Sequence, residues 1–281
     1  HPGLAFDATY TLAEALPVDA AVVPVLESTA EASAITGFFI RNSVTLRIGD
    51  ELITYKAVRK DAPFGFTECQ RGAHGTSPTA HPAGAKVHHL KECFGLFVPD
   101  PDGPLWTEVI ARTAEVYNEG GFDMIYLDAL DGSDIHGGGA WAWYYGSKFV
   151  FELANRLKKP AIFEMSTFHH HLWYVRSRMG AWDCPARGPK PFIEIHRIVN
   201  RSCRDMFLPA HLGWWAIFDW RGIQPERTTP DVLEYLGARC IADGCGLSFP
   251  VGFTPDAYEK SPNIQRLGRI VRRYEDLRRS K

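Results

Sequence analysis

The sequence has no long hydrophobic run, and no apolar stretch reaches the roughly 18 residues that a membrane-spanning helix needs. It also has little net charge, because 31 basic residues nearly balance 33 acidic ones and leave a formal charge of −2. A nucleic-acid-binding domain normally carries an obvious basic patch, so this balance argues against such a partner. We therefore expect neither a membrane nor a nucleic acid among the partners of this chain.

Cysteine is scarce and lacks the spacing of a metal site. The six cysteines include no CxxC pair, which argues against a zinc ribbon, and they are too few for a disulfide scaffold. Free thiols and one or two bridges both remain open. The chain opens with His1 rather than Met and has no basic segment followed by an apolar one. This start predicts a processed protein or an internal piece of a longer one.

Nucleotide-binding signatures are absent as well. No GxGxxG follows an apolar strand, and no GxxxxGK[ST] occurs. We therefore expect no dinucleotide fold, no phosphate-binding loop and no cofactor.

The first third of the chain has the alternating pattern of β-strands and no convincing helix. Residues 45–48 and 51–55 alternate in polarity around Gly49-Asp50, which predicts a hairpin. This stretch, with "IGDELITY", "CQRGAHGT" and "AHPAGAKV", resembles a small β module of tail-fibre-like and surface-associated proteins, and the resemblance implies no activity. We predict a β-rich module over residues 1–92, in which Arg71, His74 and His81 fix turns and loop hydrogen bonds.

From residue 93 to 281, apolar strands alternate with amphipathic helices. The first two predicted strands are Phe94–Val98 and Met124–Leu127. The pattern gives six βα units in about 190 residues, a unit length typical of an α/β fold. This pattern favours a (β/α)8-type TIM barrel over an open doubly wound sheet. The barrel is incomplete in this chain, with two units missing and the β module near the N-terminus or inserted.

Carboxylates follow four of the predicted strands. In a barrel, the residues at the carboxyl ends of the strands form the active site. Asp128 and Glu164 are one βα unit apart, so we expect them on neighbouring strands with their carboxyl groups about 5–5.5 Å apart, as in a retaining glycosidase. The sequence predicts that these two residues are catalytic. The other two carboxylates, expected to bind substrate, are Asp183 and Asp219.

Aromatic and polar side chains near these strand ends are the expected sugar contacts. Aromatic residues make up 12% of the chain, and most of the 8 tryptophans lie between Trp141 and Trp220. Flat rings can stack on sugar faces, whereas some of these rings must belong to the core. Three consecutive histidines, 169–171, cannot share one face, so no metal site is expected there. The further predicted substrate-binding residues are Asp131, His136, Trp143, His169, Trp182, His211 and Trp215.

The stretch from Gly121 to about Asp219 resembles retaining (β/α)-barrel glycoside hydrolases, locally those of the endo-α-N-acetylgalactosaminidase type. The resemblance rests on "GFDMIYLD", which ends in Asp128, and on "AIFEMS", which contains Glu164. It implies that Asp128 is the nucleophile and Glu164 the acid/base.

The sequence thus predicts a glycoside hydrolase that cleaves a polysaccharide or glycan with retention, and a secreted or periplasmic location. A polysaccharide lyase that acts on a uronate-containing glycan remains open, since Tyr126 and several histidines can serve as its base. A non-catalytic carbohydrate-binding or fibre-like protein also remains open, because of the β module.

Overall fold

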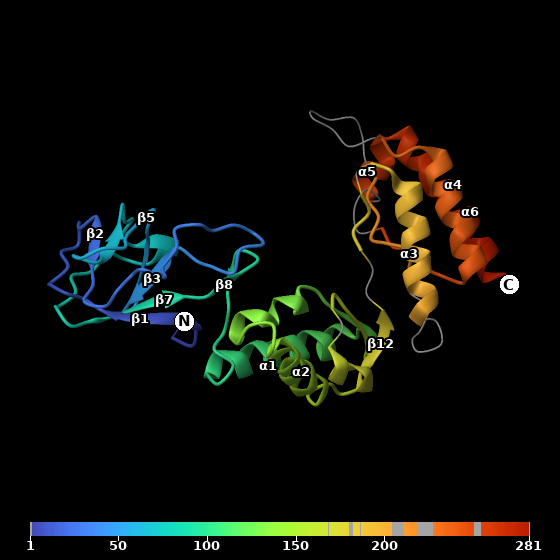
Figure 1. The fold of residues 1–281 in the computed structure, drawn as a ribbon. Helices are drawn as coiled ribbons and strands as arrows, with labels where there is room; N and C mark the ends of the chain where they lie inside the picture. Colours follow the sequence, from blue (N-terminus) through green and yellow to red (C-terminus); the bar gives the residue numbers. More distant parts are fainter. Residues whose placement is uncertain are drawn as a thin grey trace. The chain divides into compact units, whose positions relative to one another are not determined.

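The computed structural model describes residues 2–167, 169–179, 182–185, 187–203, 211–217, 227–249 and 254–280 (Figure 1). The chain groups into two compact units that alternate along the sequence. The first unit comprises His1–Gly121 and Ala129–Lys159, and the second comprises Phe122–Asp128 and Pro160–Lys281. A seven-residue segment that contains one strand therefore leaves the first unit, and the chain then returns to it.

Two small antiparallel sheets form the β-rich part of the first unit, drawn in blue and teal in Figure 1. Alternate residues of their strands point into one core, which contains the fully buried Leu46, Ile53, Tyr55 and Phe66. The predicted hairpin is confirmed, with Gly49 at a φ of 58° in its turn. In sheet order, the strands are β1 (Phe6–Thr11), β7 (Lys86–Leu90), β3 (Thr45–Ile48) and β4 (Glu51–Thr54), then β2 (Val22–Pro24), β6 (Gly65–Thr67) and β5 (Ala57–Arg59); η1 (Ala73–Gly75) is a short 3₁₀ turn.

The segment predicted as the first barrel strand, Phe94–Val98, is instead part of a tight hairpin. β8 (Glu92–Cys93) pairs antiparallel with β9 (Leu96–Phe97). The two residues between them, Phe94 and Gly95, have φ values of 53° and 75°, as a two-residue hairpin turn requires. A continuous parallel strand cannot include such a turn, so this prediction was wrong.

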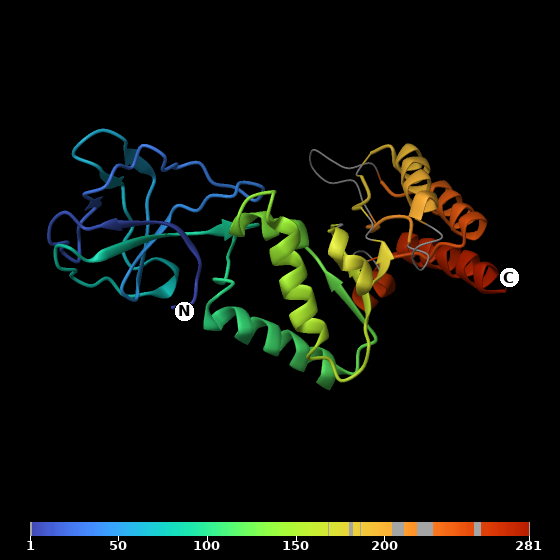
Figure 2. The same cartoon turned by 60° about the horizontal axis from the view of Figure 1, so that its bottom comes forward.

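Two helices and a 3₁₀ segment complete the first unit: α1 (Pro104–Gly120), η2 (Leu130–His136) and α2 (Ala142–Ala154). α1 ends at Gly121, whose φ of 69° is the left-handed conformation that closes many helices. Its buried stripe, Trp106, Ile110, Ala114 and Tyr117, has the spacing of one helix face, and α1 lies beside α2 (Figure 2).

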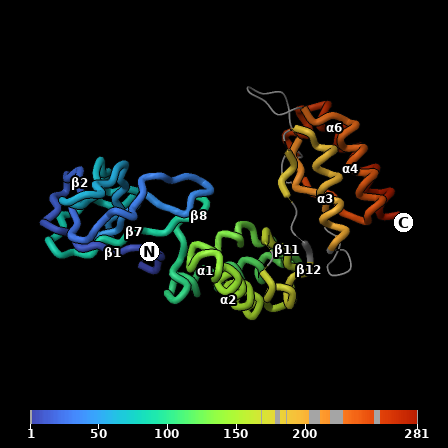
Figure 3. Tube along the Cα trace, viewed as in Figure 1, coloured from blue at the N-terminus to red at the C-terminus, as the bar shows by residue number. Residues whose placement is uncertain are grey.

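The second unit contains a three-stranded parallel sheet and a group of helices, and Figure 3 draws these helices in yellow to red. Its core holds Ile193, Leu212, Trp215, Leu236 and Leu267. Pro262 separates the last two helices, since a proline keeps the preceding residue, Ser261, extended. The elements are β10 (Met124–Leu127), β11 (Ile162–Met165), η3 (His170–Tyr174), β12 (Arg176–Met179), α3 (Pro189–Cys203), α4 (Pro230–Asp243), α5 (Pro255–Lys260) and α6 (Pro262–Arg279).

The prediction of a (β/α)8 TIM barrel is wrong. The sheets are small and mostly antiparallel, and within the described ranges no barrel closes and no set of eight parallel strands occurs. Among the described residues, parallel pairing occurs within β10, β11 and β12 and at isolated bridges such as Asp183–Trp214 and His211–Gly246. Hydrophobic periodicity identifies individual strands and helices, whereas closure depends on strand number, tilt and shear, which no local pattern encodes.

Candidate functional site

The pairing of β10 with β11 determines where the two predicted catalytic carboxylates lie. The strands are parallel neighbours, and Tyr126 is level with Glu164. Side chains alternate between the two faces of a sheet, so Tyr126, Glu164 and Asp128, two residues beyond Tyr126, point to the same face. Glu164 is fully buried inside β11, whereas Asp128 is exposed just after the end of β10.

The phenol of Tyr126 lies among these carboxylates. Its hydroxyl donates to Oδ1 of Asp128 at 3.4 Å. Burial raises the pKa of Tyr126 above its ordinary range, and the negative charges of Asp128, Glu164 and Asp183 raise it further. The hydroxyl therefore stays protonated at neutral pH and donates to the carboxylate of Asp128.

Glu164 makes a direct contact with His211. Oε1 of Glu164 is 2.9 Å from Nε2 of His211, and both side chains are at least 97% buried. The other ring nitrogen, Nδ1, lies 2.9 Å from the carbonyl oxygen of Gly213. A carbonyl oxygen only accepts, so Nδ1 carries a hydrogen and Nε2 is the nitrogen that faces the carboxyl group.

Local backbone geometry holds this histidine in place. Gly213 has a φ of 98°, and a Cβ atom there would lie 2.8 Å from the ring of Phe192. Only glycine fits both the conformation and the space, which positions the carbonyl that accepts from Nδ1. His211 also pairs in parallel with Gly246, and Asn200 donates to its backbone carbonyl at 3.3 Å.

A chain of aromatic rings connects His211 to the phenol. The ring of Trp214 lies edge-on to His211, with centroids 4.3 Å apart, and its other contact is Tyr126 at 5.0 Å. Backbone bonds fix Trp214 beside the segment that carries Asp183: its N–H donates to Trp182 O, and its carbonyl accepts from Cys184 N–H, each at 2.8 Å. The second unit thus brings together Asp128, Glu164, Asp183 and His211 through Tyr126 and Trp214.

The remaining predicted site residues of the second unit differ in their burial and in their contacts. Trp215 is buried in the core, where its indole N–H donates to Leu212 O, so Trp214 rather than Trp215 contacts the cluster. Trp182 is 47% exposed, and its ring lies 5.1 Å from that of His196. His169 is half-buried at the start of η3. Asp219 lies outside the described residues.

Asp131, His136 and Trp143 belong to the first unit. Asp131 is exposed in η2, and Trp143 is half-buried in α2. His136 packs between the rings of Trp106 and Tyr145, at 5.7 and 5.2 Å. Burial, together with the positive charge of Lys91, lowers the pKa of His136 to about 4, so the ring is neutral at physiological pH. These contacts describe a packed aromatic residue of the first unit.

His196 is a site residue that the sequence interpretation did not include. It is 99% buried on α3, and its Nε2 accepts the backbone N–H of Trp182 at 3.2 Å. A signal was present, since Phe192, His196 and Asn200 recur every four residues and therefore share one helix face. Phe192 meets Gly213, and Asn200 meets His211, so this face covers the His211 side of the cluster.

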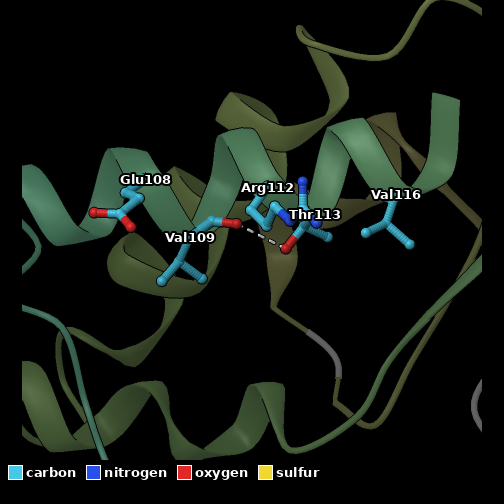
Figure 4. A pocket seen from close by; sticks show the side chains of 5 residues that line it. All are labelled: Glu108, Val109, Arg112, Thr113 and Val116. Atoms are coloured by element: carbon cyan, nitrogen blue, oxygen red, sulfur yellow. Dashed lines mark hydrogen bonds between the residues drawn. The ribbon is translucent and has the colours of Figure 1, made fainter. Parts of the chain in front are cut away.

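Across the part of the chain that the structure describes, no three His, Cys, Asp or Glu side chains are grouped closely enough to ligate a metal ion. A pocket on the first unit is lined by one face of α1, namely Glu108, Val109, Arg112, Thr113 and Val116 (Figure 4). Thr113 uses its hydroxyl within that helix, donating to Val109 O at 2.8 Å.

No family model matches the sequence, and no curated protein or solved structure matches it either. No helix within the described ranges is both long and apolar enough to cross a lipid bilayer. What the chain does must therefore be argued from the cluster itself.

Proposed function

We propose that this chain is a retaining glycoside hydrolase, with Asp128 as nucleophile and Glu164 as acid/base. The observation that carries the proposal is the parallel register of β10 and β11, which puts both carboxylates on one face with the Tyr126 hydroxyl beside them. Adjacent strands are about 4.8 Å apart, and Asp128 lies two residues, about 6.6 Å, beyond the position level with Glu164, so the two side chains must lean toward each other to reach the roughly 5–5.5 Å that retention requires.

Their environments suit different roles. Asp128 is exposed at the end of β10, so a sugar can reach it, and the phenol of Tyr126 orients its Oδ1. Glu164 is buried and hydrogen-bonded to an imidazole, an environment in which a carboxyl group can exchange a proton without bulk water. Two carboxylates in contrasting surroundings are typical of an acid and nucleophile pair.

In the proposed reaction, a carboxylate oxygen of Asp128 attacks the anomeric carbon while Glu164 gives a proton to the departing glycosidic oxygen. A glycosyl ester on Asp128 results. Water then attacks the same carbon, Glu164 takes a proton from that water, and the bond to Asp128 breaks. The anomeric configuration is inverted twice and therefore retained.

The first test is hydrolysis of a polysaccharide panel by the full chain, measured as new reducing ends. We expect Glu164→Gln to lower turnover about 10²–10⁴-fold on natural substrates, the usual contribution of general acid catalysis, and Asp128→Asn to lower it at least as much. Asp123→Asn is the matched control, because it makes the same change at the opposite end of β10.

A second arm separates the two roles. Glu164→Ala should keep measurable turnover on an activated aryl glycoside, which needs little protonation, and azide should accelerate it; Asp128→Ala should be inactive on both substrates. Wild-type activity in Asp128→Asn would refute the assignment. Products with a new ultraviolet-absorbing double bond would indicate a lyase, and binding without any product would indicate a carbohydrate-binding protein.

A further inference from the structure

The hydrogen bonds around His211 leave room for only one proton between His211 and Glu164. Nδ1–H is committed to the carbonyl of Gly213 at 2.9 Å. The 2.9 Å contact between Nε2 and Oε1 needs a hydrogen, carried either by the carboxyl group or by the imidazole. Without a proton, the lone pairs of Oε1 and Nε2 would face each other in a buried setting. With a proton on each atom, two donors would face each other.

We propose that His211 is a positioning residue for Glu164 rather than a substrate ligand, and that the two side chains hold one shared proton between Oε1 and Nε2. This inference rests on the proposed function for its catalytic consequence, but the shared proton itself does not depend on it. His211 is 98% buried and has a committed contact at each ring nitrogen, so no ring nitrogen remains to bind a sugar hydroxyl.

The shared proton is the one that the reaction moves. In the first step it passes from the pair to the glycosidic oxygen, which leaves an anionic Glu164 facing the unprotonated Nε2 of a neutral imidazole. This arrangement is unfavourable, so it favours the return of a proton in the second step. In the second step the pair takes one proton from the attacking water and returns to its starting state. Protons balance over the cycle, and His211 keeps the carboxyl oriented throughout.

The charged and titratable groups near Glu164 and His211 affect the protonation of these two side chains together. The pair as a whole is neutral while it holds its proton, which is compatible with burial next to acidic groups. Because the two sites interact strongly, their protonation belongs to the pair rather than to either residue. The groups around it are Tyr126 and Asp128 from β10, Asp183 beside Trp214, His196 on α3, Arg176 on β12, and the Cys245 thiol near Asn200.

The first test needs no substrate. Nitrogen-15 spectra of the histidine rings in the full chain should show His211 protonated at Nδ1 at neutral pH, with Nε2 in a strong hydrogen bond. Glu164→Gln should shift the Nε2 signal of His211 and leave its Nδ1 signal nearly unchanged. A neutral ring protonated at Nε2, or an Nε2 signal that ignores Glu164→Gln, would overturn the proposal.

The second test uses the pH profile of kcat/KM. His211→Gln keeps a polar side chain but has no basic nitrogen to share the proton, so the alkaline limb of the profile should move to lower pH. The loss in kcat should be larger for substrates with poor leaving groups. His89→Gln is the matched control, because it replaces a buried histidine of the first unit that contacts Asp7 and Tyr55 rather than Glu164.

The two proposals fail in different ways. If no glycan is cleaved but the spectra show the shared proton, the proposed function is wrong and the pair stands. If glycans are cleaved and His211→Gln folds with the alkaline limb unmoved, His211 does not control the proton of Glu164. Should His211→Gln fail to fold, the spectra of the wild type and of Glu164→Gln still decide.

Discussion

At the scale of single residues, buried carboxylates serve two purposes in this chain. Glu51 in the β-rich part is 99% buried and fully satisfied: Arg71 donates to both oxygens at 2.7 and 2.8 Å, His81 lies 2.7 Å away, and the backbone N–H of Thr79 donates at 3.1 Å. The predicted structural role of Arg71 and His81 is supported by these contacts. Glu164, by contrast, exchanges a proton with a neighbour.

Glu51 should make the stability of the β-rich part depend on acid. Burial raises its pKa, but the hydrogen bonds from Arg71, His81 and the backbone outweigh burial and hold the pKa at about 2. Because the pKa of Glu51 is lower in the folded state, the Glu51 carboxylate stabilises the fold at pH values above its ordinary pKa near 4.5. This stabilisation, about 3 kcal/mol, is lost as the pH falls from about 4.5 towards 2.

Glu51→Gln should therefore cost about 3–5 kcal/mol at pH 7, because it leaves Arg71 buried without its counter-charge. The cost should shrink at pH 3. Hydrogen exchange of the β3 and β4 amides, compared with the wild type at each pH, measures it. Glu14→Gln, an exposed change of the same kind, should have no effect. A cost for Glu51→Gln that is the same at both pH values would contradict this account.

At the scale of elements, close helix contacts in the second unit depend on a small residue. α4 packs on α6, and Leu236 of α4 and Leu267 of α6 share the core. Gly237 lies in the middle of α4 against the Tyr274 side chain, where an added Cβ would lie 2.6 Å from the Cβ of Tyr274. Such a distance is well inside van der Waals contact, so a larger residue must move one of the helices.

Gly237→Ala should destabilise the second unit by about 1–2 kcal/mol. Alanine gains up to about 1 kcal/mol of helix propensity over glycine, but overpacking typically costs about 1–3 kcal/mol. Urea denaturation, followed by the helical circular-dichroism signal, measures the change in the free energy of unfolding. Tyr274→Gly, which removes the Cβ and the ring, should remove the clash, so the double variant should be less destabilised than the sum of the two single changes. Strict additivity would argue against the contact.

At the scale of the whole molecule, the chain has two compact units, each with its own hydrophobic core. β10, with Tyr126 and the site's Asp128 next to it, belongs to the second unit, although α1 before it and η2 after it belong to the first. The proposed catalytic pair therefore lies within one unit.

Separate cores predict local responses to mutation. Glu51→Gln should raise hydrogen exchange in the first unit, and Gly237→Ala should raise it in the second, because a lost contact weakens mainly the cooperative unit that contains it. Peptide-level mass spectrometry of the two variants and the wild type measures this. An equal rise in both units for either variant would mean that the chain unfolds as one cooperative body.

Local structure followed from the sequence where nearby residues decide it. The hairpin at Gly49 and the strand Met124–Leu127 were predicted from turn chemistry and from an apolar run. The segment Phe94–Val98 was not, since the predicted strand is part of a hairpin with Phe94 and Gly95 in its turn. An apolar run indicates a strand but not which strand it pairs with or in which direction.

The sequence alone also identified Asp128 and Glu164 as a candidate pair of carboxylates, because each adjoins an apolar run and the two runs are one βα unit apart. Only the tertiary structure decided that no barrel closes, that Trp214 rather than Trp215 lies against the cluster, and that His211 bonds Glu164. His211 and Glu164 are 47 residues apart, and no periodicity specifies their contact. Local patterns indicate the conformational preferences of neighbouring residues. Sheet closure and side-chain pairing depend instead on long-range packing, which exists only in the folded chain.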